Sequence, residues 1–169
     1  MKCLLFLCVL VYGAFGVHGQ HTVTCEGGQP MVKVAFSVTL KAFHAAWGAV
    51  GPFPQDKVLV YKGVFLNYGG AYNPSTGVFT APVNGVYSFN YHIYGYSSNR
   101  MGVSLFKNEE RISTAYDHPS IDSTDTASNS ALLSLNKGDE VTIRLWAGHT
   151  LYMSSNNHNT FNGFLVFPV

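Results

Sequence analysis

Charged side chains are scarce in this chain. Asp, Glu, Lys and Arg make up 11% of its 169 residues, whereas a soluble domain commonly carries about 25%. The formal net charge at pH 7 is only +1. Nucleic-acid-binding surfaces need clustered Lys and Arg to neutralise phosphates, so that class of function is not expected. So few charges also indicate that part of the surface is buried against other copies of the chain.

The sequence lacks a segment with helical apolar periodicity, and after its first residues it has no apolar run long enough to span a bilayer. The early apolar run, 3–15, follows the basic Lys2 and precedes small residues at 17–19. This order is typical of a secretory signal peptide. We therefore expect 1–19 to be removed by cleavage after Gly19, with Gly16 as the alternative site, and the mature chain to be secreted and extracellular.

Cysteine is also rare, with three residues in the whole chain. Cys3 and Cys8 lie within the expected signal peptide, which leaves Cys25 as the only thiol of the mature chain. An intrachain disulfide is then excluded. An odd cysteine in an oxidising compartment predicts an interchain disulfide through Cys25, in a short N-terminal segment spanning 20–33. The alternative is an unpaired cysteine that packs against the domain.

Aromatic residues are abundant, at 14% of the chain. In residues 86–93, Tyr87, Phe89, Tyr91 and Ile93 alternate with Val86, Ser88, Asn90 and His92, which predicts a strand with one strongly apolar face. Large aromatic side chains on such a face are expected to form the core. Strands are predicted at 32–40, 58–61, 64–68, 77–80, 85–93, 101–107, 111–116, 130–135, 140–146 and 161–167.

Turn-rich segments separate these strands. Residues 42–57 contain several Gly and Pro and are expected to be a loop, and 74–77 and 82–85 are expected to be turns. Residues 107–110 and 136–139 separate consecutive strands at hairpin distance. Many short strands at this spacing indicate a sandwich or a jelly roll.

The aromatic and turn residues of 61–91 follow a long, specific pattern. Its members are Tyr61, Asn67, Tyr72, Phe79, Gly85, Tyr87, Phe89 and Tyr91. The pattern resembles the globular head domain of complement C1q, and the similarity continues through 103–107, 132–139 and 161–165. The resemblance implies an all-β, C1q/TNF-like jelly-roll sandwich of about ten antiparallel strands over 34–169, assembled as a homotrimer. Tyr61 stands where the family usually has Phe, which adds a hydroxyl near the core.

The chain contains no Gly-X-Y triplets, so a collagen stalk is not expected. It is most similar to the short secreted C1q-like and cerebellin-like proteins. The recruitment of complement proteases is not expected either, because in the family the stalk carries them.

The acidic loop 117–125 is the best candidate for a metal site. It contains Asp117, Asp122 and Asp125 among Ser and Thr, and hard oxygen ligands suit calcium. Some C1q-like trimers bind calcium near the trimer apex through two aspartates of this loop. The resemblance implies that Asp117 and Asp125 are that pair. The alternative is an ordinary solvated acidic loop.

A second candidate site is the loop formed by Asn156, Asn157, His158 and Asn159. Amide-rich loops on a rigid scaffold suit sugars or polar protein surfaces, although ordinary turn composition explains them as well. The sequence Asp117-His118-Pro119-Ser120 places triad residue types side by side, but a triad needs groups that converge in space on a positioned nucleophile. No catalytic or cofactor site is therefore predicted, and calcium is the one cofactor considered.

These features favour a non-enzymatic, secreted, trimeric recognition module of innate immunity that binds microbial or altered-self surfaces. The alternative is a cerebellin- or adipokine-like signalling ligand that clusters cell-surface receptors. Expected partners are other copies of the chain and extracellular protein or carbohydrate ligands. The ligand itself cannot be named from sequence, because specificity in this fold depends on variable loops.

Overall fold

A computed structural model describes residues 32–41, 48–96, 98–121 and 123–169. These residues belong to one compact unit, Val32–Val169. Cys25, the expected signal peptide and nearly all of segment 20–33 lie outside the described residues. Over the described ranges, no helix is long and apolar enough to cross a membrane.

The described chain consists of β-strands joined by turns. In chain order these strands are β1 (Ala35–Thr39), β2 (Gly48–Val50), β3 (Lys57–Val58), β4 (Gly63–Tyr68), β5 (Tyr72–Asn73), β6 (Val78–Thr80), β7 (Gly85–Tyr96), β8 (Met101–Lys107), β9 (Glu110–Asp117), β10 (Thr124–Leu135), β11 (Glu140–Leu145), β12 (Leu151–Met153) and β13 (Thr160–Pro168).

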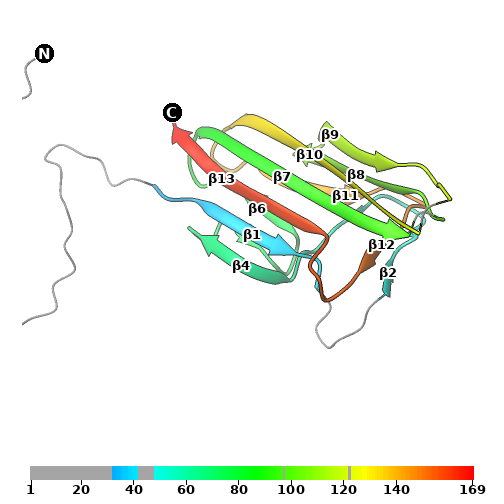
Figure 1. The fold of residues 1–169 in the computed structure, drawn as a ribbon. Coiled ribbons are helices and arrows are strands. Elements are labelled where there is room, and N and C mark those ends of the chain that lie inside the picture. Colours follow the sequence, from blue (N-terminus) through cyan, green and yellow to red (C-terminus); the bar gives the residue numbers. More distant parts are fainter. Residues whose placement is uncertain (1–31, 42–47, 97, 122) are drawn as a thin grey trace, which may run out of the picture. The chain divides into compact units, whose positions relative to one another are not determined.

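Two antiparallel sheets pack face to face. One is five-stranded, in the order β10-β7-β13-β1-β4, and the other is six-stranded, with β5-β6-β11-β8-β9 in line and β3 paired to β11. Figure 1 shows the first sheet in front of the second, with the short pair β2 and β12 at one end. This arrangement confirms the predicted all-β sandwich of antiparallel strands.

Strand β7 explains why the sandwich has an apolar interior. Tyr87, Phe89, Tyr91 and Ile93 point inward and are each 0% exposed. They alternate with residues that point away from the core, as a period-2 strand requires. Burying side chains of this size removes large apolar areas from water and stabilises the packed sheets. The aromatic residues of the sequence pattern are thus core residues, as predicted.

The core rings pack in edge-on and stacked pairs drawn from both sheets. Phe36 lies 4.8 Å from Phe161 and 5.1 Å from Tyr72, and Phe79 lies 5.2 Å from Phe89. Gly163 of β13 leaves room for them, because an added Cβ would come within 2.6 Å of the Phe36 and Phe89 rings. A residue without a side chain at this point lets two rings meet over the sheet.

Most buried tyrosine hydroxyls have a hydrogen-bond partner. The Tyr72 hydroxyl accepts the backbone N–H of Tyr61 at 3.0 Å and donates to the Tyr61 carbonyl at 3.2 Å. The Tyr87 hydroxyl donates to the Val83 carbonyl, and the Tyr91 hydroxyl pairs with Ser113. The Tyr61 hydroxyl is buried and finds no partner within the described part of the chain.

Each of the ten predicted strands has a counterpart in the structure, but three short strands were not predicted: β2, β5 and β12. Each has only two or three residues, too few for an alternating pattern to be visible. The segment 42–57 was predicted to be a loop, but 48–50 form β2 and Lys57 belongs to β3. Residues 42–47 of that segment lie outside the described residues.

The second predicted hairpin is wrong. Residues 107–110 do join paired strands, since Lys107 of β8 faces Glu110 of β9. Residues 136–139, however, connect β10 of the five-stranded sheet to β11 of the six-stranded sheet. The turn bonds instead to residues 81–84, which connect β6 and β7. The N–H of Gly138 donates to the Ala81 carbonyl and the N–H of Lys137 to the Asn84 side chain.

Candidate functional site

The acidic pair of the sequence comes together between β9 and β10. Asp117 is the last residue of β9 and Asp125 the second residue of β10. One carboxylate oxygen of Asp125 accepts a hydrogen bond from the Ser120 hydroxyl at 3.1 Å. The Oδ2 atom of Asp117 is buried and has no hydrogen-bond partner among the described residues. Asp122, the third aspartate of the loop, lies outside the described residues.

Electrostatics show that the two carboxylates interact. Burial raises the pKa of Asp117, and the nearby negative charge of Asp125 raises this pKa further. A pair of like charges that share one site disfavours ionisation of either group. A cation between them would remove this penalty, so the adjacent Asp117 and Asp125 carboxylates fit a hard ion such as calcium.

The pair alone is an incomplete ligand set. No group of three or more His, Cys, Asp or Glu side chains able to hold a metal ion occurs within the ranges that the structure describes. Calcium prefers six to eight oxygen ligands. Two carboxylates per chain would therefore need backbone oxygens, water or carboxylates of further copies of the chain to complete the coordination.

The loop 156–159 serves partly as a structural junction. Asn159 is 1% exposed. Its side-chain oxygen accepts the Tyr94 N–H at 2.9 Å, and its side-chain nitrogen donates to the Tyr152 carbonyl at 2.8 Å. Asn156 is exposed. A ligand could therefore reach the Asn156 side chain, whereas the Asn159 side chain is buried in the fold.

The remaining two loop residues face a tyrosine cluster. The His158 ring packs edge-on against Tyr94 at 4.2 Å, and Tyr96 lies 4.6 Å from Tyr152. Asn157 adopts a left-handed backbone conformation, with φ 57°. Buried polar atoms of Asn157 and His158 have no partner among the described residues. The sequence did not indicate these tyrosines: Tyr94 and Tyr96 lie on β7 beyond its predicted end, and Tyr152 lies on β12, which was not predicted.

Over its described strands, the outer face of the five-stranded sheet carries no Asp, Glu, Lys or Arg side chain. This uncharged face consists of the outward-pointing residues Leu66 and Tyr68 of β4, Ala35 and Ser37 of β1, Thr160, Asn162, Phe164 and Phe167 of β13, Val86, Ser88, Asn90, His92, Tyr94 and Tyr96 of β7, and Thr124, Thr126, Ser128, Ser130, Leu132 and Ser134 of β10.

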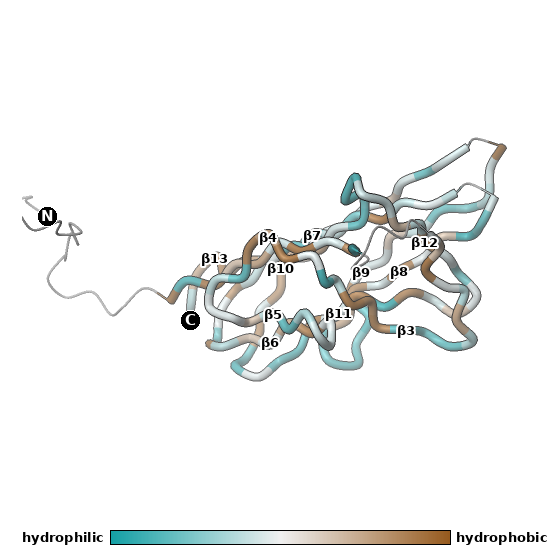
Figure 2. The backbone as a smooth tube through the Cα atoms, turned by 90° about the horizontal axis from the view of Figure 1, so that it is seen from below, coloured by the Kyte–Doolittle hydropathy of each residue, from teal (hydrophilic) through white to brown (hydrophobic). Residues whose placement is uncertain are grey.

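Hydrogen bonds run across the middle of the uncharged face. The Ser37 hydroxyl donates to the Asn162 side chain at 2.6 Å, which in turn donates to Asn90 at 2.9 Å. Apolar groups flank this polar row: Leu132 is 67% and Phe164 46% exposed. Every exposed large hydrophobic side chain on a described strand belongs to this sheet, and Figure 2 shows the hydrophobic colour on β4.

The outer face of the six-stranded sheet, in contrast, carries charged side chains that contact aromatic rings. Arg144 lies 4.2 Å from the centre of the Phe106 ring, and Arg111 lies 5.5 Å from Phe106 and 5.4 Å from the Trp146 ring. Glu109 pairs with Arg144 through both carboxylate oxygens, at 2.8 and 3.0 Å. Cation–π contacts of this kind stabilise by about 0.5–1 kcal/mol each at exposed sites. Charged groups on this face are thus present and compensated.

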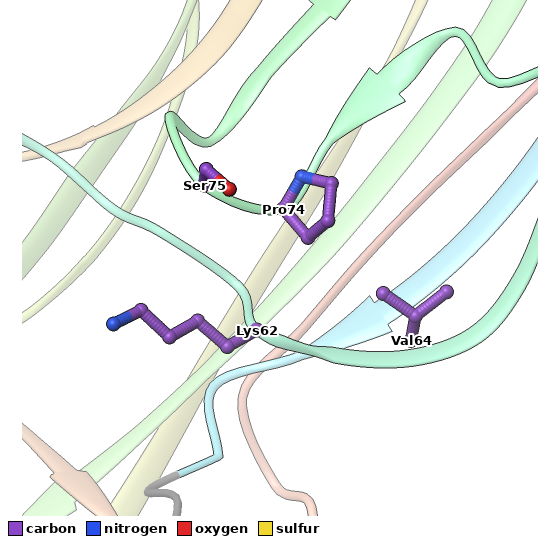
Figure 3. A pocket seen from close by; sticks show the side chains of 4 residues that line it. All are labelled: Lys62, Val64, Pro74 and Ser75. Atoms are coloured by element: carbon purple, nitrogen blue, oxygen red, sulfur yellow. The ribbon is translucent and has the colours of Figure 1, made fainter.

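A shallow hollow of about 380 Å³ lies beside the start of β4. Figure 3 shows its lining by Lys62, Val64, Pro74 and Ser75. Lys62 is the only titratable side chain in this lining. Because its walls lack converging polar groups, we assign this hollow no chemistry.

In the described part of the chain, His118 and Ser120 of the sequence Asp117-His118-Pro119-Ser120 bond to side chains outside this sequence. The Ser120 hydroxyl donates to Asp125, and the His118 ring pairs with the Tyr116 hydroxyl at 3.3 Å. In a triad the hydroxyl nucleophile is bonded to the imidazole, and the imidazole to a carboxylate.

Comparison with known proteins agrees with the architecture. The family model described as C1q domain matches residues 35–166. The collagen alpha-1(X) chain of Mus musculus is 35% identical over 155 residues, which cover 90% of this chain and 21% of that protein. The chain therefore spans about a fifth of the length of this curated relative.

Solved structures show the same fold. The globular domain of zebrafish complement 1qA protein has a TM-score of 0.63 and 27% identity, with 81% of this chain and 100% of that chain covered. Murine APRIL has a TM-score of 0.60 at 9% identity, covering 79% and 99% of the two chains. Eiger TNF from S. frugiperda has a TM-score of 0.60 at 16% identity, covering 81% and 94%. The last two likenesses concern the fold alone.

Proposed function

The chain belongs to the C1q domain family, and from this membership we propose that it is a secreted, non-enzymatic recognition module that works as a homotrimer. In this proposal the trimer presents several copies of one binding surface to microbial or altered-self ligands. Multivalent display raises apparent affinity without any new contact, because the second and third binding events are intramolecular.

The uncharged face supports the assembly. A surface that stays in water commonly carries charges, and the opposite sheet has Arg111 and Arg144 on its outer face. The five-stranded sheet instead presents a hydrogen-bonded polar row flanked by exposed Phe164, Leu132 and Tyr68. Depletion of charge with aromatic enrichment is the composition of an interface core. We therefore place this face between protomers.

Analytical ultracentrifugation tests the assembly directly. The parent chain should sediment as a stable trimer at micromolar concentration. Leu132→Asp and Phe164→Asp should shift it to monomer, because each puts an unpaired carboxylate into a desolvated interface. Ser75→Asp, in an exposed turn outside the uncharged face, is the matched control and should leave the trimer intact. A parent chain that is monomeric at these concentrations would refute the assembly.

Cys25 is proposed to link chains covalently. It lies outside the described residues, so the proposal rests on its being the only cysteine downstream of the expected signal peptide. Non-reducing electrophoresis should show covalent dimers or larger species that disappear with reductant and in Cys25→Ser. A single monomer band together with a titratable thiol would contradict the linkage.

Two binding experiments separate recognition from signalling. Pull-down of the purified trimer on bacteria, polysaccharides and immunoglobulin tests the recognition role. A screen against cell-surface receptors tests the alternative, in which the trimer clusters receptors as a signalling ligand. Binding only to a receptor would replace the proposed recognition role, whereas binding to microbial surfaces would support it.

A further inference from the structure

His92 is the residue of the uncharged face whose side chain changes charge near neutral pH. It lies on β7, between β10 and β13 in the five-stranded sheet (Figure 1). Histidine gains a proton between roughly pH 8 and pH 5, whereas tyrosine ionises only at about pH 10. The described strands of this sheet contain no second histidine. Mild acid therefore changes the charge on these strands at His92 alone.

The neighbours of His92 on this face are neutral. They are the residues opposite it on the flanking strands and the next residues along the same face of β7: Ser128, Thr160, Asn90 and Tyr94. Hydroxyl and amide groups can accept a hydrogen bond from a protonated imidazole, but they carry no charge to compensate it. The His92 side chain is exposed in the single chain, so water solvates its charged form there.

The other titratable groups of the surrounding elements supply no carboxylate to His92. Within the described strands of this sheet, Asp125 is the only Asp, Glu, Lys or Arg residue, and it pairs with Gly95 on the inward side of β10. The His158 ring packs edge-on against Tyr94 at 4.2 Å. Protonation of His158 would add a second positive charge and would not compensate the first.

The acidic pair Asp117 and Asp125 responds to acid in the opposite sense. Burial and the charge of Asp125 raise the pKa of Asp117, so acidification neutralises this carboxylate and removes the repulsion within the pair. Neutral carboxyl groups favour close approach of several chains. Dissociation of an assembly in mild acid would therefore not come from this pair.

We propose that protonation of His92 dissociates the homotrimer, which makes the assembly a pH-dependent switch. This inference rests on the proposed function, because it takes the uncharged face as the contact between protomers. A contact between chains removes water from this face, and an ionised imidazole without a carboxylate beside it is costly there. The monomer therefore binds protons more readily than the trimer does. Since the state that binds more protons gains as the pH falls, acid favours the monomer and neutral pH restores the trimer.

The switch would act on ligand binding through the number of sites. Each homotrimer contains three copies of His92, so the effect of one protonation is repeated in every chain and the response to pH is steep. The monomer keeps its own binding surface but loses multivalent display, which raises apparent affinity in the trimer. A surface bound through several protomers would therefore be released in mild acid.

Sedimentation equilibrium of the full chain at about pH 7.5, 6.5 and 5.5 tests the switch across the range in which histidine titrates. EDTA removes metal ions and a reductant breaks any disulfide through Cys25, so that neither holds the chains together. The chain concentration at the midpoint between monomer and trimer should rise at least about tenfold from the highest to the lowest pH. Circular dichroism should show the same fold at each pH, which separates dissociation from unfolding.

Three variants isolate the imidazole. His92→Gln keeps a neutral, hydrogen-bonding side chain and should form a trimer whose midpoint changes less than about twofold over the same pH range. His92→Lys is charged at every pH used and should be monomeric even at neutral pH. His149→Gln is the matched control, because His149 packs against Tyr116 of the six-stranded sheet and against Trp146, and it should respond to pH as the parent does.

The outcomes separate the switch from the assembly. A parent trimer whose midpoint stays constant or falls in acid would overturn the switch and leave the proposed assembly intact. A His92→Gln variant that dissociates in acid as the parent does would overturn the switch as well. A parent that is monomeric at neutral pH would instead refute the assembly, and the switch with it.

Discussion

The buried tyrosines differ in one respect that matters for stability. Tyr72, Tyr87 and Tyr91 each combine a buried ring with a hydrogen-bonded hydroxyl. Tyr61 has the buried ring without a partner for its hydroxyl among the described residues. Burial raises the pKa of Tyr61 well above its usual range, and that of Tyr72 to about 12. Leaving a buried donor unsatisfied costs about 1–3 kcal/mol.

Tyr61→Phe should therefore stabilise the domain by about 1 kcal/mol, because the substitution removes a desolvated hydroxyl and keeps the ring. Urea denaturation followed by circular dichroism measures the change as a higher midpoint at an unchanged slope. Tyr72→Phe is the matched control. Its hydroxyl bonds both the N–H and the carbonyl of Tyr61, so its removal should lower stability. A loss of stability in Tyr61→Phe would show that its hydroxyl has a partner.

Residue 61 also shows how far sequence reasoning reaches at this scale. Alternation placed the aromatic side chains of β7 in the core correctly, and the departure from the family's Phe placed an extra hydroxyl near the core. Whether that hydroxyl is bonded depends on Tyr72 and Tyr91, which approach it only in the folded sandwich. Local sequence patterns predict which side chains are buried, but they do not predict which polar atoms of distant segments pair with one another.

Among the elements, β10 is the one whose extent was least visible in the sequence. Its second half alternates apolar residues and was predicted as a strand, whereas residues 124–129 contain Thr, Ser, Asn and Asp and were not. These residues pair with 91–96 of β7, and their outward side chains lie on the uncharged face. The inward positions of this half are Asp125, Ala127 and Asn129, of which only Ala127 is apolar and packs against the core, so no apolar–polar alternation is visible in the sequence.

Asp117, the last residue of β9, contributes to the pH dependence of stability. A carboxyl whose pKa is raised by folding favours the folded state at low pH, and this contribution is lost as the pH rises through the raised pKa. Asp117→Asn should therefore raise the urea midpoint at pH 7 in metal-free buffer. At a pH below the ordinary carboxyl pKa it should have little effect, because Asp117 is then protonated in both states.

Asp139→Asn provides a control of opposite sign. Hydrogen bonds from Asn108 and from the backbone of Asn136 lower the pKa of Asp139, and Lys107 lies 3.2 Å away. The stability that Asp139 contributes is present at neutral pH and is lost as the pH falls through the lowered pKa. Its amide variant should therefore be less stable than the parent at pH 7. Parallel shifts of both variants would contradict the assigned pKa directions.

At the scale of the whole molecule, the two outer faces of the sandwich have different chemistry. One presents the pairs Arg144–Glu109 and Arg111–Asp56, and the other presents only uncharged groups on its described strands. The low overall charge, which was evident from composition, predicted that some surface is buried. Composition could not say which surface, since that depends on the register of β10, β7 and β13.

Calcium dependence joins the acidic pair to the assembly. If three chains bring Asp117 and Asp125 toward a common axis, as we propose, up to six carboxylates lie near one another and repel at close range. A bound calcium ion reverses this effect, so calcium should raise the melting temperature of the parent and EDTA should lower it. The gain is about 2.7 kcal/mol when calcium is present at a hundred times its dissociation constant. Asp125→Asn should weaken the response without unfolding the domain, since Asp125 lies only partly buried at the start of its strand. If EDTA leaves the melting curve of the parent unchanged, the acidic pair is a solvated feature of the loop and the calcium proposal fails.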